Sequence, residues 1–227
     1  MANAFDILLK RRYDGDITSP IKKPKRDDED DFSPPTMLMD VMGARLRMLK
    51  FGNSALTGEC VDFVKDKLAI RPKIKIYGKE IEQARDVGFF SEKVPYYTYS
   101  RTRHLSKGWA PCLQNMVDLV NKKFGASYNG ILVNRYAPDQ CICAHSDNEQ
   151  ELDSNAGVVT LSVGQTRSFV VRWKKAREDH PRKYVFKLKD GEMLQMAGQF
   201  QQLFTHEVPR DKNATAVRYS FTFRHHE

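Results

Sequence analysis

The hydrophobic pattern changes from helical to alternating after Gly125, and this change constrains the fold more than any other feature of the sequence. Apolar residues recur at helical spacing over residues 113–124. Pro111 stands where a first-turn proline is tolerated, and Gly125 supplies a C-terminal stop. A shorter helix with one apolar face is expected over residues 57–68. The helices are therefore expected to precede most of the strands.

Short runs of alternating apolar residues fill the chain beyond Gly125. Turn residues such as Asp190-Gly191 separate them. The predicted strands cover residues 131–136, 157–163, 168–173, 184–188 and 217–223. Helices followed by many short strands predict an α+β protein whose strands close into a jelly-roll sandwich or barrel.

The first 36 residues differ from the rest in composition. They combine a short apolar patch with basic clusters, an acidic run and prolines, so residues 1–36 are expected to form a disordered tail and residues 37–227 one catalytic domain. The tail holds 7 Lys and Arg against 8 Asp and Glu, whereas the whole chain carries a net charge of +8. The positive charge therefore belongs to the domain and favours a polyanionic partner.

Two features of the tail suggest where the protein acts. The clusters Lys10-Arg11-Arg12 and Lys22-Lys23-Pro24-Lys25-Arg26 have the arrangement of a bipartite nuclear import signal, which predicts a nuclear protein, otherwise a cytoplasmic one. The apolar peptide of residues 3–9 could dock on a repair partner such as a sliding clamp. Four cysteines without paired spacing and no membrane-length apolar run predict a soluble intracellular protein with free thiols and no membrane partner.

A possible metal motif lies in the β region. His145 and Asp147 are two residues apart, so in a strand both point to one face, and His206 would arrive from a distant strand. Two histidines and one carboxylate are typical of non-haem iron oxygenases. Cys141 and Cys143 share that strand face and could suggest zinc, but an isolated C-x-C within a strand is more typical of core packing, with Cys143 near the pocket.

A second cluster lies near the end of the chain. Arg218, Ser220 and Arg224 alternate onto one strand face, where cationic forks can hold a small dicarboxylate. A solvated strand face with scattered arginines is the alternative.

These motifs, taken together, resemble the AlkB family of iron(II)- and 2-oxoglutarate-dependent dioxygenases, and most closely its duplex-DNA alkylation repair type. The resemblance runs over about residues 72 to 224 and includes Asn134-Arg135-Tyr136, His145-x-Asp147-x-Glu149, His206 and Arg218-Tyr219-Ser220-Phe221-Thr222-Phe223-Arg224. It implies a double-stranded β-helix, or jelly-roll, core with N-terminal helices and a β-hairpin lid over the substrate. It also implies that His145, Asp147 and His206 bind Fe(II). Arg218, Ser220 and Tyr136 would hold the distal carboxylate of 2-oxoglutarate, with Arg224 and Asn134 near its chelating end.

The same resemblance implies a reaction. The enzyme would demethylate alkylated bases such as 1-methyladenine and 3-methylcytosine, releasing formaldehyde while 2-oxoglutarate and O2 become succinate and CO2. DNA, single-stranded or duplex, is the expected partner and repair the expected role. Alternatives are an RNA demethylase or protein hydroxylase of the same superfamily, or a nucleic-acid binding module without catalysis.

Several residues are expected to contact the nucleic acid. Because a stacked base cannot reach a buried metal, it must be flipped out, and Tyr99 is expected to stack on it with Tyr97 close by. Both tyrosines could instead pack in the core. Asn148 and Glu149 follow the metal motif, where the duplex-repair relative has two acidic residues. The phosphate contacts are assigned to the basic positions Arg172, Lys174, Lys175 and Arg177, with Arg182-Lys183 beside them, a run that could equally be a solvated face.

A hairpin tip at Ile76-Tyr77-Gly78 is the last predicted element of the substrate site. Gly78 permits a tight turn and would leave Tyr77 at the tip. The segment resembles the finger that the duplex-repair relative inserts into the base stack, with Lys75 and Lys79 near phosphates. A tyrosine packed on its own domain is the alternative.

Overall fold

The computed structural model describes residues 34–76, 78–99, 102–147, 149, 152 and 156–227. The import-like clusters, the peptide of residues 3–9, Tyr77 and Asn148 lie outside the described residues. Strand β1 already begins at Thr36.

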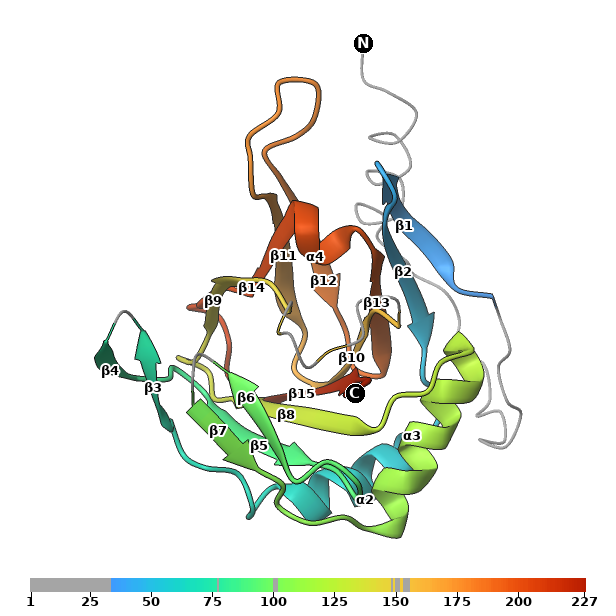
Figure 1. Ribbon diagram of the computed structural model, residues 1–227, viewed down its shortest axis with the longest axis vertical. Helices are drawn as coiled ribbons and strands as arrows, with labels where there is room; N and C mark the ends of the chain where they lie inside the picture. The colour runs from blue at the N-terminus through green and yellow to red at the C-terminus, as the bar shows by residue number, and fades with distance from the viewer. Residues whose placement is uncertain (1–33, 77, 100–101, 148, 150–151, 153–155) are drawn as a thin grey trace.

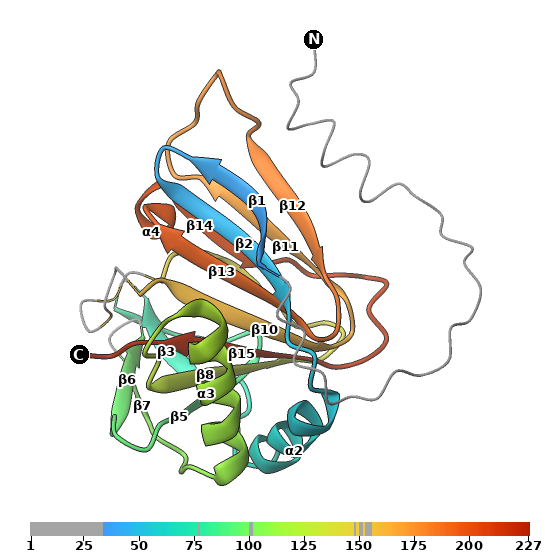
Figure 2. The same ribbon diagram turned by 90° about the vertical axis from the view of Figure 1, so that its right-hand side faces the viewer.

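Two antiparallel sheets form the core and face each other (Figures 1 and 2). The larger sheet has the strand order β1 (Thr36–Val41), β2 (Ala44–Lys50), β13 (Glu192–Gly198), β10 (Val158–Gly164), β15 (Arg218–Arg224), β8 (Gly130–Tyr136) and β5 (Asp86–Phe90). The smaller sheet has the order β12 (Lys183–Leu188), β11 (Arg167–Trp173), β14 (Phe204–Val208) and β9 (Ile142–His145). Buried residues of both sheets pack into one apolar cluster. The predicted jelly-roll architecture is therefore confirmed.

Two helices cover the outer face of the larger sheet (Figure 2). Helix α2 (Ser54–Val64) is capped by Asn53, whose side chain accepts a hydrogen bond from the Leu56 N–H. Helix α3 (Pro111–Phe124) ends at Gly125 in the left-handed conformation, as its sequence predicts. This packing leaves the inner face of the larger sheet free to line a site against the smaller sheet.

Two small hairpins and a short helix complete the fold. One hairpin pairs β3 (Lys73–Ile76) with β4 (Lys79–Glu82), and the other pairs β6 (Tyr96–Tyr99) with β7 (Thr102–Leu105). Gly78 adopts a φ of 78° at the turn of the first hairpin, consistent with the predicted tight turn. Helix α4 (Phe200–Leu203) immediately precedes β14.

The five predicted strands are confirmed, whereas three strands rich in methionine and leucine were not predicted. Strands β1, β2 and β13 are rich in methionine and leucine, which favour helices in isolation. Pairing of β2 with both β1 and β13 overrides that preference. Consequently strands, rather than helices, begin the described part of the chain, and α2 starts three residues earlier than expected. Within that part, no helix has the length and apolar character needed to span a membrane.

Candidate active site

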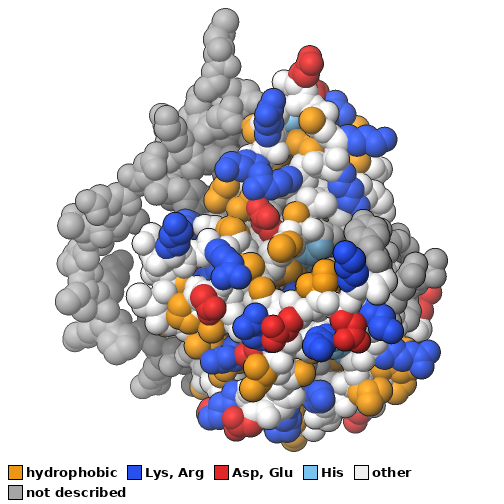
Figure 3. Space-filling view, turned by 90° about the vertical axis from the view of Figure 1, so that its left-hand side faces the viewer, with side chains coloured by type: hydrophobic (Ala, Val, Ile, Leu, Met, Phe, Trp, Pro, Cys, Tyr) orange, Lys and Arg blue, Asp and Glu red, His pale blue; other side chains and the backbone are white. Residues whose placement is uncertain are grey.

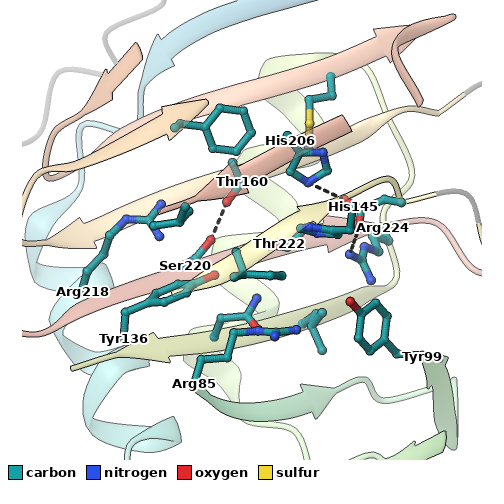
Figure 4. Close-up of a pocket in the computed structure, with 17 residues that line it drawn as sticks. Arg85, Tyr99, Tyr136, His145, Thr160, His206, Arg218, Ser220, Thr222 and Arg224 are labelled. Carbon is teal, nitrogen blue, oxygen red and sulfur yellow. Dashed lines mark hydrogen bonds and ion pairs between the residues drawn. The ribbon is translucent and has the colours of Figure 1, made fainter. Parts of the chain in front are cut away.

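The three predicted metal ligands converge at one end of a buried cavity between the sheets (Figure 4). His145 on β9 and His206 on β14 are cross-strand partners. Their Nε2 atoms lie 3.7 and 3.6 Å from the two carboxylate oxygens of Asp147. The potential ligand atoms all lie within 4.8 Å of one another, so one cation can contact all three.

The sequence predicted that alternation along one strand brings Asp147 to the same face as His145, and this part of the prediction is wrong. Strand β9 ends at His145, so Asp147 lies beyond the strand and not two positions along it. Its carboxylate instead accepts a 2.5 Å hydrogen bond from Arg224 Nη2, and its backbone N–H donates to the Gln201 side chain over 3.0 Å. Side chains rather than strand geometry therefore position this carboxylate.

The charge state of the triad suits a metal ion. Burial lowers the pKa of His206 to about 3, with a smaller contribution from His145, and burial also lowers the pKa of His145. Burial alone would raise the pKa of Asp147, but Arg224 and the two histidines hold it below its usual range. Two neutral imidazoles and one carboxylate are the forms that bind a divalent cation.

The other end of the cavity is built from the central strands. Arg218 on β15 donates from Nε to Ser162 Oγ over 2.9 Å and lies 5.3 Å from the centre of the Tyr136 ring. Ser220 lies 2.6 Å from Thr160 Oγ1. Arg218 is 1% exposed, its Nη1 has no acceptor, and no acidic partner is found for it among the described residues. A buried cation with an unpaired N–H fits a carboxylate ligand.

Arg85 lines the same cavity but was not predicted. It is buried and donates from Nε to Asn134 Oδ1 over 2.7 Å, so it fixes the amide of a predicted cosubstrate residue. Its guanidinium lies 5.7 Å from the centre of the Tyr99 ring. The sequence around Arg85 has no periodicity that signals this position, which follows from pairing of β5 with β8.

Tyr99, predicted to stack on the base, and Tyr97, predicted to lie close by, occupy different environments. Tyr99 lines the cavity, and its ring lies edge-on to His145 at 6.5 Å (Figure 4). Tyr97 is fully buried and donates from its hydroxyl to Glu149 Oε1 over 2.5 Å. Burial raises the pKa of Tyr97 well above its usual value, so this hydroxyl remains a donor. Tyr97 therefore contacts the site through Glu149, whereas Tyr99 offers a ring.

The predicted phosphate contacts are separate from the cavity. Arg172 pairs with Glu207 at 2.8 Å, Arg177 pairs with Asp179 at 3.0 Å, and Lys174 donates to the Gln201 carbonyl over 2.7 Å. Lys175 is exposed on the loop between β11 and β12, which projects at the top of Figure 1. On the face shown in Figure 3, Lys and Arg side chains are dispersed among acidic and apolar ones.

The two strand cysteines do not join the metal cluster. Cys143 is exposed and does not line the cavity. Among the described residues, the only grouping of three potential ligands contains no cysteine. Cys143 was expected to line the pocket, but its side chain is exposed and does not do so, although its backbone carbonyl lies 2.9 Å from His145 Nδ1.

Comparison with known families places the chain in a class of enzymes. Residues 60–224 match the 2OG-Fe(II) oxygenase superfamily, and the chain belongs to it. Membership specifies Fe(II), 2-oxoglutarate and O2 as cofactor and cosubstrates. The residues present fit them, because three metal ligands stand at one end of the cavity and Arg218 Nη1 and Arg224 Nη1 are buried donors without acceptors.

Individual relatives narrow the resemblance to AlkB proteins. The chain is 32% identical over 158 residues to mouse DNA oxidative demethylase ALKBH2, covering 67% of this chain and 66% of that protein. It is 33% identical over 135 residues to rat alpha-ketoglutarate-dependent dioxygenase alkB homolog 3, covering 56% and 46%. The matched region thus spans less than two thirds of these relatives. The solved structure of OsALKBH1 has a TM-score of 0.55 at 16% identity, covering 84% of this chain and all of that one, which supports the fold.

Proposed function

We propose that this protein oxidatively demethylates alkylated bases in DNA, such as 1-methyladenine and 3-methylcytosine. The observation that carries the proposal is the cavity itself, with a His-Asp-His cluster at one end and the unpaired Arg218 at the other. The similarity to enzymes named DNA oxidative demethylase supports the substrate class.

Each end of the cavity would have its own task. His145, Asp147 and His206 would hold iron, while Arg218, Ser220 and Tyr136 would bind the distal carboxylate of 2-oxoglutarate. Asn134, oriented by Arg85, and Arg224 would lie near its other end. Iron, 2-oxoglutarate and O2 together supply the oxidation that releases the methyl group as formaldehyde, with succinate and CO2 as the other products. The protein's own contribution is to orient these groups.

The substrate would enter beside the β6–β7 hairpin. Tyr99 would stack on the flipped base, and Glu149, fixed by Tyr97, would face its polar edge. Asn148 would lie beside Glu149, and Tyr77, which lies between β3 and β4 in the sequence, would fill the gap left in a duplex. Lys175 and its basic neighbours Arg172, Lys174 and Arg177 would contact phosphates.

The tail supports two further proposals on location and partners. The basic clusters of residues 10–12 and 22–26 would direct nuclear import, and residues 3–9 would bind a partner such as a sliding clamp. A reporter fused to residues 1–36 tests import, since a cytoplasmic reporter contradicts it. A pull-down with the double substitution Phe5→Ala and Leu8→Ala tests the docking peptide.

The discriminating experiment compares three substrates under one condition. Matched oligonucleotides carrying 1-methyladenine are supplied as single-stranded DNA, duplex DNA and RNA, and formaldehyde and succinate are measured. We expect stoichiometric formation of both products on DNA. A larger rate on RNA would assign the enzyme to RNA, and the absence of formaldehyde on all three would refute the demethylase. The Asp147→Asn variant serves as the inactive control.

A further inference from the structure

The carboxylate ligand of the metal cluster lacks the support that the histidines receive from the sheet. His145 and His206 face each other in a β-ladder, but β9 ends at His145. Asp147 is 5% exposed, so its backbone N–H requires a partner inside the protein. That partner is a side chain, Gln201 Oε1, at 3.0 Å.

Gln201 is itself held on several sides. It belongs to α4 and is 9% exposed. Its Nε2 lies 3.7 Å from Met196 Sδ, a weak acceptor, and its carbonyl accepts a hydrogen bond from Lys174 Nζ over 2.7 Å. Because the acceptor oxygen faces a backbone N–H, which can only donate, the orientation of the amide is determined. The Gln201 side chain is therefore held in one orientation inside the protein.

Gln201 lies in the same segment of the chain as the metal ligand His206. Gln201 precedes His206 by five residues, so one continuous segment supplies a metal ligand and the support of another. A second bond ties the two segments together, because Ser146 Oγ donates to the Phe204 carbonyl over 3.0 Å. Two side-chain bonds therefore join the segment that follows β9 to the α4–β14 segment, which carries His206.

We propose that Gln201 is a positioning residue for the metal site, which sets the direction of the Asp147 carboxylate by holding its backbone. Arg224 restrains one carboxylate oxygen and Gln201 restrains the main chain, so both ends of the residue are fixed. Partners of metal ligands typically change metal affinity by about 10- to 100-fold when removed. The proposal concerns the metal site and is independent of which substrate is oxidised.

The test measures metal binding without turnover. Metal-free protein is titrated with Co(II), and the dissociation constant and the visible absorption spectrum of the bound ion are recorded. In Gln201→Leu, which keeps the side-chain size but removes the acceptor, we expect the Kd to rise by about 10- to 100-fold with a changed spectrum. The matched control is Gln202→Leu, its exposed neighbour on the same helix, which should retain the wild-type Kd.

The possible results distinguish a failure of the Gln201 proposal from a failure of the metal-site assignment. Binding of Co(II) by Gln201→Leu with wild-type Kd and spectrum would overturn the proposal, while absence of Co(II) binding by the wild type would refute the metal site itself. If Gln201→Leu does not fold, Gln201→Asn replaces it, since the shorter amide withdraws the acceptor but stays polar. A raised Kd for Co(II) in a folded Gln201→Asn supports the positioning role of Gln201, and an unchanged Kd overturns it.

Discussion

Two parts of the cavity are constructed differently: the end at Arg218, which we name the deep end, and the part lined by Tyr99, which we name the mouth. At the deep end, Arg218 and Ser220 lie on β15, which pairs with β10 on one side and β8 on the other. At the mouth, Tyr99 lies on β6, whose only described partner strand is β7. Groups on a central strand are fixed by two ladders, whereas a two-stranded hairpin depends on fewer contacts. The rigid end thus suits the constant cosubstrate, and we expect the hairpins to contribute the part of the site that selects substrates.

The largest effect is expected at the metal cluster. Asp147→Asn should reduce demethylation by at least ~1,000-fold, or about 4 kcal/mol of activation free energy, because the charged ligand is lost. The amide keeps an oxygen for Arg224, so the melting temperature of the metal-free protein should change little, unlike that of Asp147→Ala, which leaves a buried cation unpaired. Near-normal turnover with saturating iron would exclude Asp147 as a ligand.

The next largest effect tests the deep end. Arg218→Lys keeps the charge but loses the planar fork, so the KM for 2-oxoglutarate should rise by roughly 10-fold or more. Binding of Co(II) should be unaffected, because Arg218 makes no contact with the triad in the described structure. An unchanged KM for 2-oxoglutarate would place the cosubstrate elsewhere in the cavity.

Strand geometry made part of the cavity predictable from sequence. Alternate residues of a strand share a face, so the spacing predicted that Arg218, Ser220 and Arg224 face one side of a strand, and all three line the cavity, with Arg224 bonded to Asp147 at its metal end. No comparable rule connects Gln201 to Asp147, since their bond joins a short helix to a segment beyond a strand end. Arg85 was missed for the same reason. Sequence periodicity reports which face a residue occupies, but not which distant side chain it meets.

A third prediction concerns the mouth. Tyr99→Ala should lower kcat/KM for a methylated oligonucleotide by about 10-fold, since stacking of a base on an aromatic ring contributes ~1–3 kcal/mol. The KM for 2-oxoglutarate should stay constant, which separates the mouth from the deep end. If the KM for 2-oxoglutarate rises by the same factor as kcat/KM for the oligonucleotide falls, Tyr99 maintains the shape of the cavity and does not stack on the base.

A fourth prediction addresses Tyr77. Tyr77→Ala should lower activity on duplex DNA by several-fold, because filling the gap left by a flipped base offsets a few kcal/mol of unstacking. Activity on the same sequence in single-stranded form should be retained. A matched control is Lys79→Ala at the start of β4, which should weaken binding to both forms in a salt-dependent manner. Equal losses on both substrates for Tyr77→Ala would assign the tyrosine a structural role.

The last prediction concerns the stability of the protein in acid and the buried His226. His226 packs edge-on against Phe89 and Tyr97, and burial, with smaller contributions from Arg224 and His225, lowers its pKa to about 4. A histidine whose pKa is lower in the folded state stabilises the fold as the neutral form. Its contribution is complete above the unfolded pKa of about 6.5 and is lost as the pH falls towards 4.

Replacing this histidine should therefore flatten the dependence of stability on pH. Between pH 7 and pH 5 the metal-free wild type should lose about 1–2 kcal/mol more unfolding free energy than His226→Leu, measured by urea denaturation. The buried His145 and His206 titrate in both proteins, so the difference isolates His226. If instead both proteins lose equal stability, protonation of His226 does not drive the acid sensitivity.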